Sequence, residues 1–89
     1  MKIKEGFVLR SVADNFIVIG VDGEAVDFNG MITLNETGAF LWRILTEQDI
    51  SRDGLVKMLT SEYMVDVNIA EEDIDAFLKK LADADVLTK

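Results

Sequence analysis

The chain contains no histidine and no cysteine. Without cysteine it can form neither a disulfide nor a thiolate nucleophile or thiolate metal site. Without histidine it also lacks the most usual general base and a common zinc ligand. We therefore expect a protein that is not an enzyme and that holds no cofactor and no metal.

Carboxylates are the reactive groups that remain, and their densest run is Glu71-Glu72-Asp73. Adjacent side chains on a helix point in different directions around its axis, so they cannot converge on one cation as the ligands of a calcium loop do. The run is better interpreted as a solvated helix start, where negative charge meets the positive end of the helix dipole.

Proline is absent too, and no apolar run approaches the length of about 18 residues that suggests a membrane span. There is no linker, repeat or low-complexity tract, so residues 1–89 are expected to form one domain. The segment from Met1 to Glu5 lacks the apolar region of a signal peptide, which predicts a cytoplasmic protein.

Basic residues are few, because nine Lys and Arg stand against seventeen Asp and Glu, for a formal net charge of −8. Contacts from Lys and Arg to phosphates dominate nucleic-acid affinity, and the basic residues form no evident stripe. The balance predicts that neither nucleic acid nor an anionic membrane surface is a partner.

Two β-rich segments open the chain, Phe7 to Val12 and Phe16 to Val21, with a hairpin-length loop at Ala13-Asp14-Asn15 between them. We expect these two strands to pair antiparallel. The second segment is an almost continuous apolar run, which is typical of a strand covered on both faces.

In the run of residues 27–42 a turn, a strand and a helix are expected to follow one another directly, with no linker between them. Asn29-Gly30 is the strongest two-residue hairpin signal. Met31 to Leu34 then predicts a short strand, and Asn35 is suited to cap the helix that follows. Two alternatives stay open for Val26 to Phe28: pairing across the turn with this strand, or an irregular loop.

The apolar spacing becomes helical after Asn35 and predicts a first helix that ends near Thr46 to Gln48. Its apolar stripe consists of Phe40, Leu41, Ile44 and Leu45. Ser51 is suited to cap a second helix that Tyr63 closes. The residues predicted to share one face of that helix are Leu55, Met58, Leu59 and Glu62.

A third helix is predicted from about Ile69 or Ala70 to Asp83, after a connection over Met64 to Asn68. The acidic residues 71–73 would lie in its first turn and two lysines near its end, in agreement with the helix dipole. Its apolar positions are Ala70, Ile74, Phe77, Leu78 and Leu81. Strands followed by helices predict an α+β fold, a small three-stranded antiparallel sheet followed by three helices.

Two positions allow both a structural and a functional interpretation. Gly38 is costly in the first turn of a helix, and we favour a close approach of the second or third helix over a binding role. Trp42 could anchor a partner, as aromatic residues often do. Beside Leu41 and Ile44, however, core burial is the favoured interpretation.

The last predicted strand, Met31 to Leu34, is expected to leave one edge unpaired, because three short strands cannot close a barrel. A peptide can add to such an edge as a further strand, with affinity from main-chain hydrogen bonds and specificity from alternate side chains. A peptide-binding module is therefore the main alternative to the enzyme hypothesis, which the missing histidine and cysteine oppose.

Four segments of the chain resemble the PqqD family of small accessory proteins, which are named for pyrroloquinoline quinone biosynthesis and are related to the RiPP recognition element that binds leader peptides. The segments are Phe7-Val8-Leu9-Arg10, Ala25 to Gly30, Leu34 to Ala39 and Glu71 to Leu78. They follow the order of the family pattern over nearly the whole chain. The chain departs from the shortest members by an insertion at Asp22 to Gly30. The resemblance implies a winged-helix-like arrangement.

The resemblance also implies a non-catalytic peptide chaperone or adaptor, in which a peptide adds beside the last strand and packs against the third helix. The main-chain contacts would come from Met31, Ile32, Thr33 and Leu34, and the groove wall from Asp73, Ala76, Phe77, Lys80 and Leu81. Core burial stays open for Phe77 and Leu81. The implied partners are a precursor (leader) peptide and a radical S-adenosylmethionine enzyme that modifies it.

Two further functions stay open, a winged-helix DNA-binding regulator and an orphan protein-protein interaction domain. Charge opposes the first, because the third helix carries more acidic than basic residues and would meet phosphates with the wrong sign. Binding of a leader peptide is therefore the preferred hypothesis.

Overall fold

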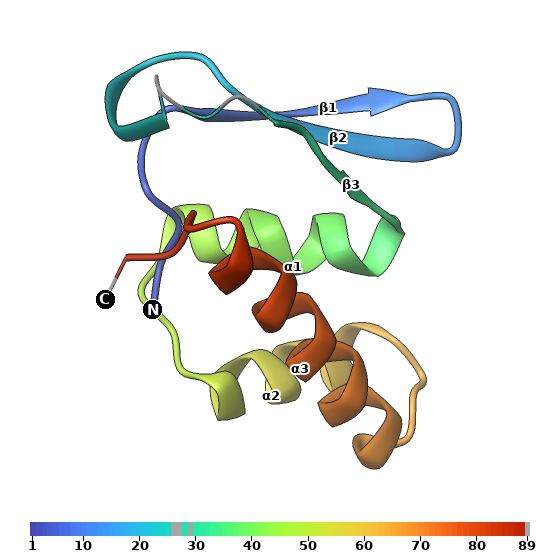
Figure 1. The fold of residues 1–89 in the computed structure, drawn as a ribbon. Helices are drawn as coiled ribbons and strands as arrows, with labels where there is room; N and C mark the ends of the chain where they lie inside the picture. The colour runs from blue at the N-terminus through green and yellow to red at the C-terminus, as the bar shows by residue number, and fades with distance from the viewer. Residues whose placement is uncertain (26–27, 29, 89) are drawn as a thin grey trace.

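The computed structural model describes residues 1–25, 28 and 30–88, except for the side chain of Glu24. Within these residues a three-stranded antiparallel sheet is followed by three α-helices, which confirms the predicted α+β fold (Figure 1). The elements are β1 Phe7–Val12, β2 Asn15–Gly20, the short 3-10 helix η1 Gly23–Ala25, β3 Ile32–Leu34, α1 Glu36–Glu47, α2 Arg52–Glu62 and α3 Val67–Asp83.

Strand β2 lies in the centre of the sheet and pairs antiparallel with both β1 and β3. Val18 of β2 is opposite Leu9 on one side and Ile32 on the other. Residues directly opposite one another point to the same face of a sheet. These three side chains therefore share the face that is directed at the helices, and Val18 is fully buried there.

The other face of the sheet is less covered than the sequence suggested. Ile17 and Ile19 alternate with Val18 along β2 and are only half-buried. In Figure 1 the helices lie on one side of the sheet. The expectation that the second strand is covered on both faces was therefore wrong, because the helices cover only the face with Val18 and leave Ile17 and Ile19 partly exposed on the other.

Strand β3 passes into α1 through Asn35. The Asn35 side-chain oxygen accepts hydrogen bonds from the Gly38 N–H at 2.8 Å and from the Thr37 hydroxyl at 3.0 Å. The predicted N-cap and the direct passage from strand to helix are therefore confirmed. The strand begins at Ile32, one residue later than predicted, and Met31 before it is exposed.

The predicted turn at Asn29-Gly30 depends on a residue outside the described part of the chain, and so do both alternatives for Val26 to Phe28, pairing across the turn and an irregular loop. Phe28 itself is described. Its ring lies edge-on to that of Phe7, with 5.3 Å between the ring centroids. A Cβ added to Gly20 would lie 3.1 Å from the Cβ of Phe28. Phe28 therefore packs over the pair that Phe7 and Gly20 form between β1 and β2.

Both remaining helices begin at side-chain caps. Ser51 caps α2 as predicted, since its hydroxyl accepts a hydrogen bond from the Gly54 N–H at 3.0 Å. Helix α3 begins at Val67, earlier than the predicted start at Ile69 or Ala70. The reason is Asp66, whose carboxylate accepts the N–H of the next residue but one at 2.8 Å. The acidic residues 71–73 consequently lie beyond the first turn, in which no acidic residue is found.

Helix α2 is rotated relative to its predicted orientation. Its buried residues are Leu55, Val56 and Leu59. Met58 and Glu62, which the spacing placed on the buried face, are exposed. Val56 is buried instead. The packing of α2 against α1 and α3 decides which side of the helix is covered. The spacing of apolar residues alone does not predict that side.

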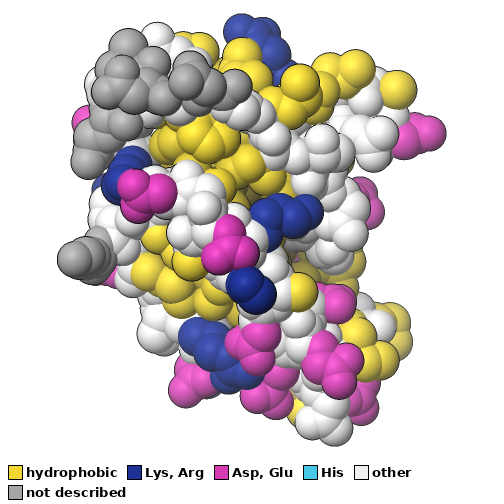
Figure 2. Space-filling model, viewed as in Figure 1, with side chains coloured by type: hydrophobic (Ala, Val, Ile, Leu, Met, Phe, Trp, Pro, Cys, Tyr) yellow, Lys and Arg dark blue, Asp and Glu magenta, His cyan; other side chains and the backbone are white. Residues whose placement is uncertain are grey.

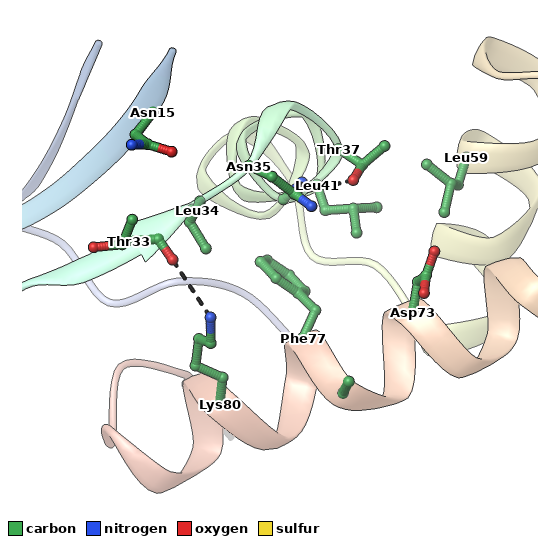
Figure 3. A pocket seen from close by; sticks show the side chains of 12 residues that line it. Asn15, Thr33, Leu34, Asn35, Thr37, Leu41, Leu59, Asp73, Phe77 and Lys80 are labelled. Carbon is green, nitrogen blue, oxygen red and sulfur yellow. Dashed lines mark hydrogen bonds between the residues drawn. The ribbon is translucent and has the colours of Figure 1, made fainter. Parts of the chain in front are cut away.

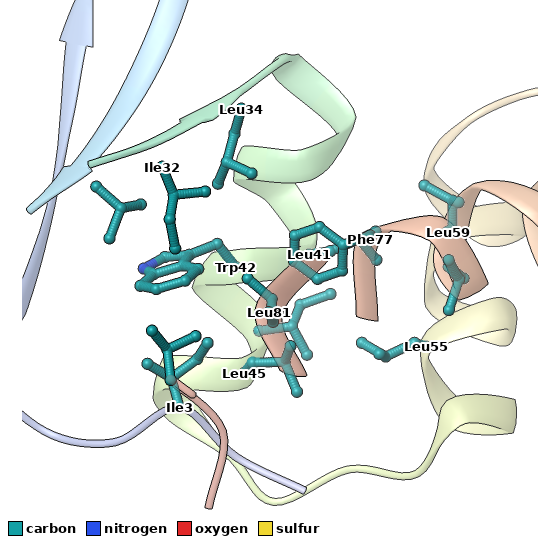
Figure 4. Close-up of a cluster of buried hydrophobic side chains, with 14 of the residues drawn as sticks. Ile3, Ile32, Leu34, Leu41, Trp42, Leu45, Leu55, Leu59, Phe77 and Leu81 are labelled. Carbon is teal, nitrogen blue, oxygen red and sulfur yellow. The ribbon is translucent and has the colours of Figure 1, made fainter. Parts of the chain in front are cut away.

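The hydrophobic core lies between the sheet and the helices and continues among the three helices (Figure 4). Trp42 is only 2% exposed, which confirms the core interpretation. Gly38 permits a close approach, but not of the partners predicted. A Cβ at Gly38 would lie 3.2 Å from both the Leu34 Cβ and the Asn35 Oδ1, so it is the end of β3 that packs against this glycine.

The two terminal segments lie side by side against the end of α1. Ile3 pairs antiparallel with Leu87. The Ile3 N–H donates to the Leu45 carbonyl at 3.0 Å, and the Thr88 N–H donates to the Lys2 carbonyl at 2.7 Å. Figure 1 shows the described parts of the two terminal segments close together, on the left of the molecule.

Candidate functional site

A groove with a volume of about 460 Å³ opens between β3, the first turn of α1 and α3 (Figure 3). Its floor is apolar and comes from four different elements. The floor residues are each no more than 7% exposed and are Leu34, Leu41, Leu59 and Phe77. Such a floor favours apolar side chains of a ligand over water.

The rim of the groove is polar, and its two sides have different sources. One side is the passage from β3 into α1, with Thr33, Asn35 and Thr37. The other side is one flank of α3, with the exposed residues Asp73, Ala76 and Lys80. The space-filling view shows acidic and basic side chains mixed over the face that contains α3 (Figure 2).

The open edge of β3 forms part of this groove. The Lys80 ammonium donates to the Thr33 carbonyl at 3.4 Å. Figure 3 shows Lys80 and β2 on opposite sides of β3. In the sheet order β1-β2-β3, no described strand lies beyond β3.

The contact with Lys80 identifies the direction of the main-chain groups along β3. The N–H and C=O of one strand residue point to the same side, and those of its neighbours point to the other side. Because the Thr33 carbonyl faces Lys80, the Thr33 N–H also faces the open edge. The main-chain groups of Ile32 and Leu34 then face β2, where these residues are opposite Val18 and Phe16.

The structure brings together most of the residues predicted for the site. Those that line the groove are Thr33, Leu34, Asp73, Ala76, Phe77 and Lys80. Three predicted residues do not line it. Met31 precedes β3 and is exposed, the Ile32 side chain is buried in the core, and Leu81 is fully buried. Leu81 follows Lys80 on the helix and is directed inward, so only its neighbour reaches the groove.

Sequence reasoning missed six lining residues, which are Asn15, Asn35, Thr37, Gly38, Leu41 and Leu59. Asn35, Thr37 and Gly38 directly follow the predicted binding strand, and this adjacency was a usable signal. Asn15 and Leu59 are brought to the groove by the β1–β2 hairpin and by α2, and no local pattern marks them.

Helix α3 is tied to α2 on a side that does not line the groove. The Arg52 guanidinium donates to both carboxylate oxygens of Asp75, at 2.6 and 2.9 Å, and to Glu71 at 3.3 Å. The hydrogen bonds from Arg52 lower the pKa of Asp75, and those to Asp75 raise the pKa of Arg52. These contacts with α2 therefore hold α3 in place from the side opposite to the groove.

Two kinds of site receive no support from the described residues. Within them, no group of three or more carboxylates gathers closely enough to hold a metal ion. None of the helices in this part of the chain is both long and apolar enough to cross a membrane.

The family model described as "Coenzyme PQQ synthesis protein D (PqqD)" matches residues 17–87. Two solved structures share the fold. One, "TbiB1 in Complex with the TbiA(beta) Leader Peptide", is 25% identical with a TM-score of 0.74, and the match covers 98% of this chain and 94% of that chain. The other, "Lasso peptide synthetase B1 complexed with the leader peptide", is 20% identical with a TM-score of 0.70, covering 99% and 96%. No curated protein matches the chain.

Proposed function

The chain belongs to the PqqD family, and from this membership and the groove we propose that it is a non-catalytic adaptor that binds the leader region of a ribosomally made precursor peptide. The observation that carries the proposal is the open edge of β3, which faces an apolar groove walled by α3. The structure of TbiB1, a protein of the same fold, holds a leader peptide and supports this proposal.

Binding would proceed by strand addition. The peptide lies between β3 and α3 and exchanges main-chain hydrogen bonds with Thr33, whose N–H and C=O both face the open edge. Alternate peptide side chains then point toward the groove floor. These hydrogen bonds give sequence-independent affinity, and the fit of the inward side chains gives specificity.

The groove is suited to apolar side chains of the peptide. Its volume of about 460 Å³ lies in the range of about 300–1,000 Å³ that is usual for ligand pockets. Leu34 and Phe77 face one another across the part of the floor nearest to β3 (Figure 3). Burial of one leucine-sized side chain there would contribute about 1.5–3 kcal/mol.

The partner enzyme carries the chemistry in this proposal. The adaptor has neither histidine nor cysteine, so the modification of the bound precursor takes place on a second protein. Following the family resemblance, we propose a radical S-adenosylmethionine enzyme for this role. The adaptor delivers the leader and leaves the rest of the precursor free to enter that enzyme.

Two proline variants of β3 test strand addition, with a synthetic leader peptide as the probe, taken from any short precursor found to be encoded near the gene. Proline removes the N–H donor and crowds the strand edge. Thr33→Pro should stay folded, because its N–H faces outward, and should bind the leader at least about tenfold more weakly. Ile32→Pro should be severely destabilised, because its N–H faces β2.

Two conservative variants serve as controls. Thr33→Val keeps the main-chain donor and should keep the affinity measured by calorimetry. Ile32→Val should lose only about 0.5–1.5 kcal/mol of stability. Full affinity of a folded Thr33→Pro variant would contradict strand addition at β3.

A further inference from the structure

Lys80 caps one main-chain group on the open edge of β3. Its ammonium donates to the outward carbonyl of Thr33, and at 3.4 Å this contact is longer than the usual N–H···O range of about 2.7–3.2 Å. Both residues are exposed, so water competes for the same groups. The contact is therefore weak, and a peptide N–H can displace it at little cost.

The ammonium groups of Lys80 and of its neighbour Lys79 have different kinds of partner. Lys79 lies on the same turn of α3 and pairs with Asp83 at 3.1 Å. Arg52 and Lys4 likewise have carboxylate partners. Within the described residues Lys80 makes no ion pair. The same is true of Lys2, Arg10, Arg43 and Lys57, but none of these four lines the groove. A cation at the groove rim is thus held by a carbonyl and not by a carboxylate.

We propose that Lys80 exchanges partners when a peptide binds. In the free protein it caps the Thr33 carbonyl, and in the complex the peptide's main-chain N–H takes this carbonyl while Lys80 turns to a carboxylate of the peptide. The inference rests on the proposed function and adds the substrate class to it. The protein thus selects leader peptides that carry Asp or Glu next to the residue that pairs with Thr33.

The geometry of the groove also sets the spacing of the peptide's side chains. Peptide residues on either side of the one opposite Thr33 point toward α3, because successive side chains alternate. These two positions are about 6.6–6.8 Å apart along a strand. Phe77 and Lys80 are three residues apart on α3, and such side chains have Cβ atoms about 5–6 Å apart. One inward position therefore takes an apolar side chain over Phe77, and the other takes an acid at Lys80.

A positional-scanning library of acetylated, amidated decapeptides tests the selection, with each position fixed in turn as Glu, Gln or Lys. Wild type should prefer Glu over Gln at one position by about two- to fivefold, the range of an exposed ion pair. Lys80→Met should lose this preference and still bind, and Lys80→Glu should prefer Lys. The matched control Lys79→Met should keep the preference for Glu.

The carbonyl carbon shift of Thr33 tests the cap in the free protein. It should change in Lys80→Met and stay unchanged in Lys79→Met, whose side chain pairs with Asp83. An unchanged shift in both variants would overturn the cap, and an equal preference for Glu in wild type and Lys80→Met would overturn the exchange.

The role of Lys80 and the adaptor function can be tested separately, because they give different results in the two assays. Peptides that bind wild type without any acid preference, and lose affinity in Thr33→Pro, would leave the adaptor role standing and remove the role of Lys80. A library and a precursor leader that bind no form of the protein would remove both.

Discussion

The ring of Phe7 stands edge-on to the indole of Trp42, with 5.8 Å between the centroids and 87° between the planes. Phe7 belongs to β1 and Trp42 to α1, so this pair joins the sheet to the helical layer. Edge-to-face aromatic pairs contribute about 0.5–1.5 kcal/mol beyond the area that they bury. The groove depends on this junction, since both layers contribute residues to its lining.

Trp42→Ala should destabilise the protein by about 3–5 kcal/mol, the usual cost of removing a large aromatic residue from a core. Urea unfolding would measure the loss. Val12→Ala is the control, because Val12 is 51% exposed and should cost little. An emission maximum of wild-type tryptophan typical of water, together with unchanged stability of Trp42→Ala, would contradict the burial.

Gly6→Ala should destabilise the protein by about 2 kcal/mol or more. Gly6 has a φ of 101°, and a Cβ there would lie 1.8 Å from the Asp22 carbonyl oxygen. Strained backbone costs about 1–3 kcal/mol, and the overlap adds to it. Thermal melting would measure the change.

The reverse substitution at a second site is the control for Gly6→Ala. Ala13 has a left-handed φ of 55°, which costs an L-residue about 1–2 kcal/mol. Ala13→Gly should therefore leave stability unchanged or raise it by up to about 1 kcal/mol. Equal losses in both variants would show that backbone conformation is not the cause.

The ion pair of Arg52 with Asp75 should make stability depend on pH. Its hydrogen bonds lower the pKa of Asp75 in the folded chain, so this stabilisation is fully present above the unfolded value of about 3.9. It is lost as the pH falls through the lower folded value. Asp75→Asn should therefore melt below wild type at pH 7, and the gap should close as the pH falls below the unfolded value and through the lower folded one.

Asp83→Asn is the comparison for Asp75→Asn. Asp83 pairs with Lys79 on its own helix, so its replacement loosens no contact between helices and should change melting less. Salt at about 1 M should narrow the Asp75→Asn gap by screening. A gap that persists at low pH would show that the charge of Asp75 is not its source.

Ala76→Trp should block the groove without unfolding the protein. Ala76 is exposed on the groove rim, whereas Ala82 is exposed on α3 but does not line the groove. Both tryptophan variants carry the same change in helix propensity and should melt alike. Only Ala76→Trp should lose leader affinity, by about tenfold or more in calorimetry. Equal affinity of the two variants would place the peptide elsewhere.

Local chemistry explains which parts of the fold were predictable. Asn35 and Ser51 were identified as caps because their side chains bond to N–H groups only a few residues away. The start of α3 was missed because Ile69 and Ala70 begin the apolar spacing, whereas the cap, Asp66, precedes it. A helix start depends on its cap, and apolar spacing detects only the covered part of a helix.

Local sequence patterns predict only part of the groove lining. Thr33 and Lys80 could be placed at it from strand and helix patterns. Leu59 and Asn15 reach it only because α2 and the β1–β2 hairpin pack as they do. Lys80 and Leu81 are neighbours in sequence, but one is exposed and the other is fully buried. That difference follows from the rotation of α3 against the sheet.

The pairing of Ile3 with Leu87 has a consequence for protein architecture. The two terminal segments run side by side. The fold could therefore be inserted at a single point of a longer chain without forcing the two flanking residues far apart. Domains with adjacent ends tolerate insertion and circular permutation. This fold could therefore be inserted through its two ends into a surface loop of another protein, such as a modifying enzyme. Such an insertion would join the groove to another protein without cutting any helix or strand of this fold.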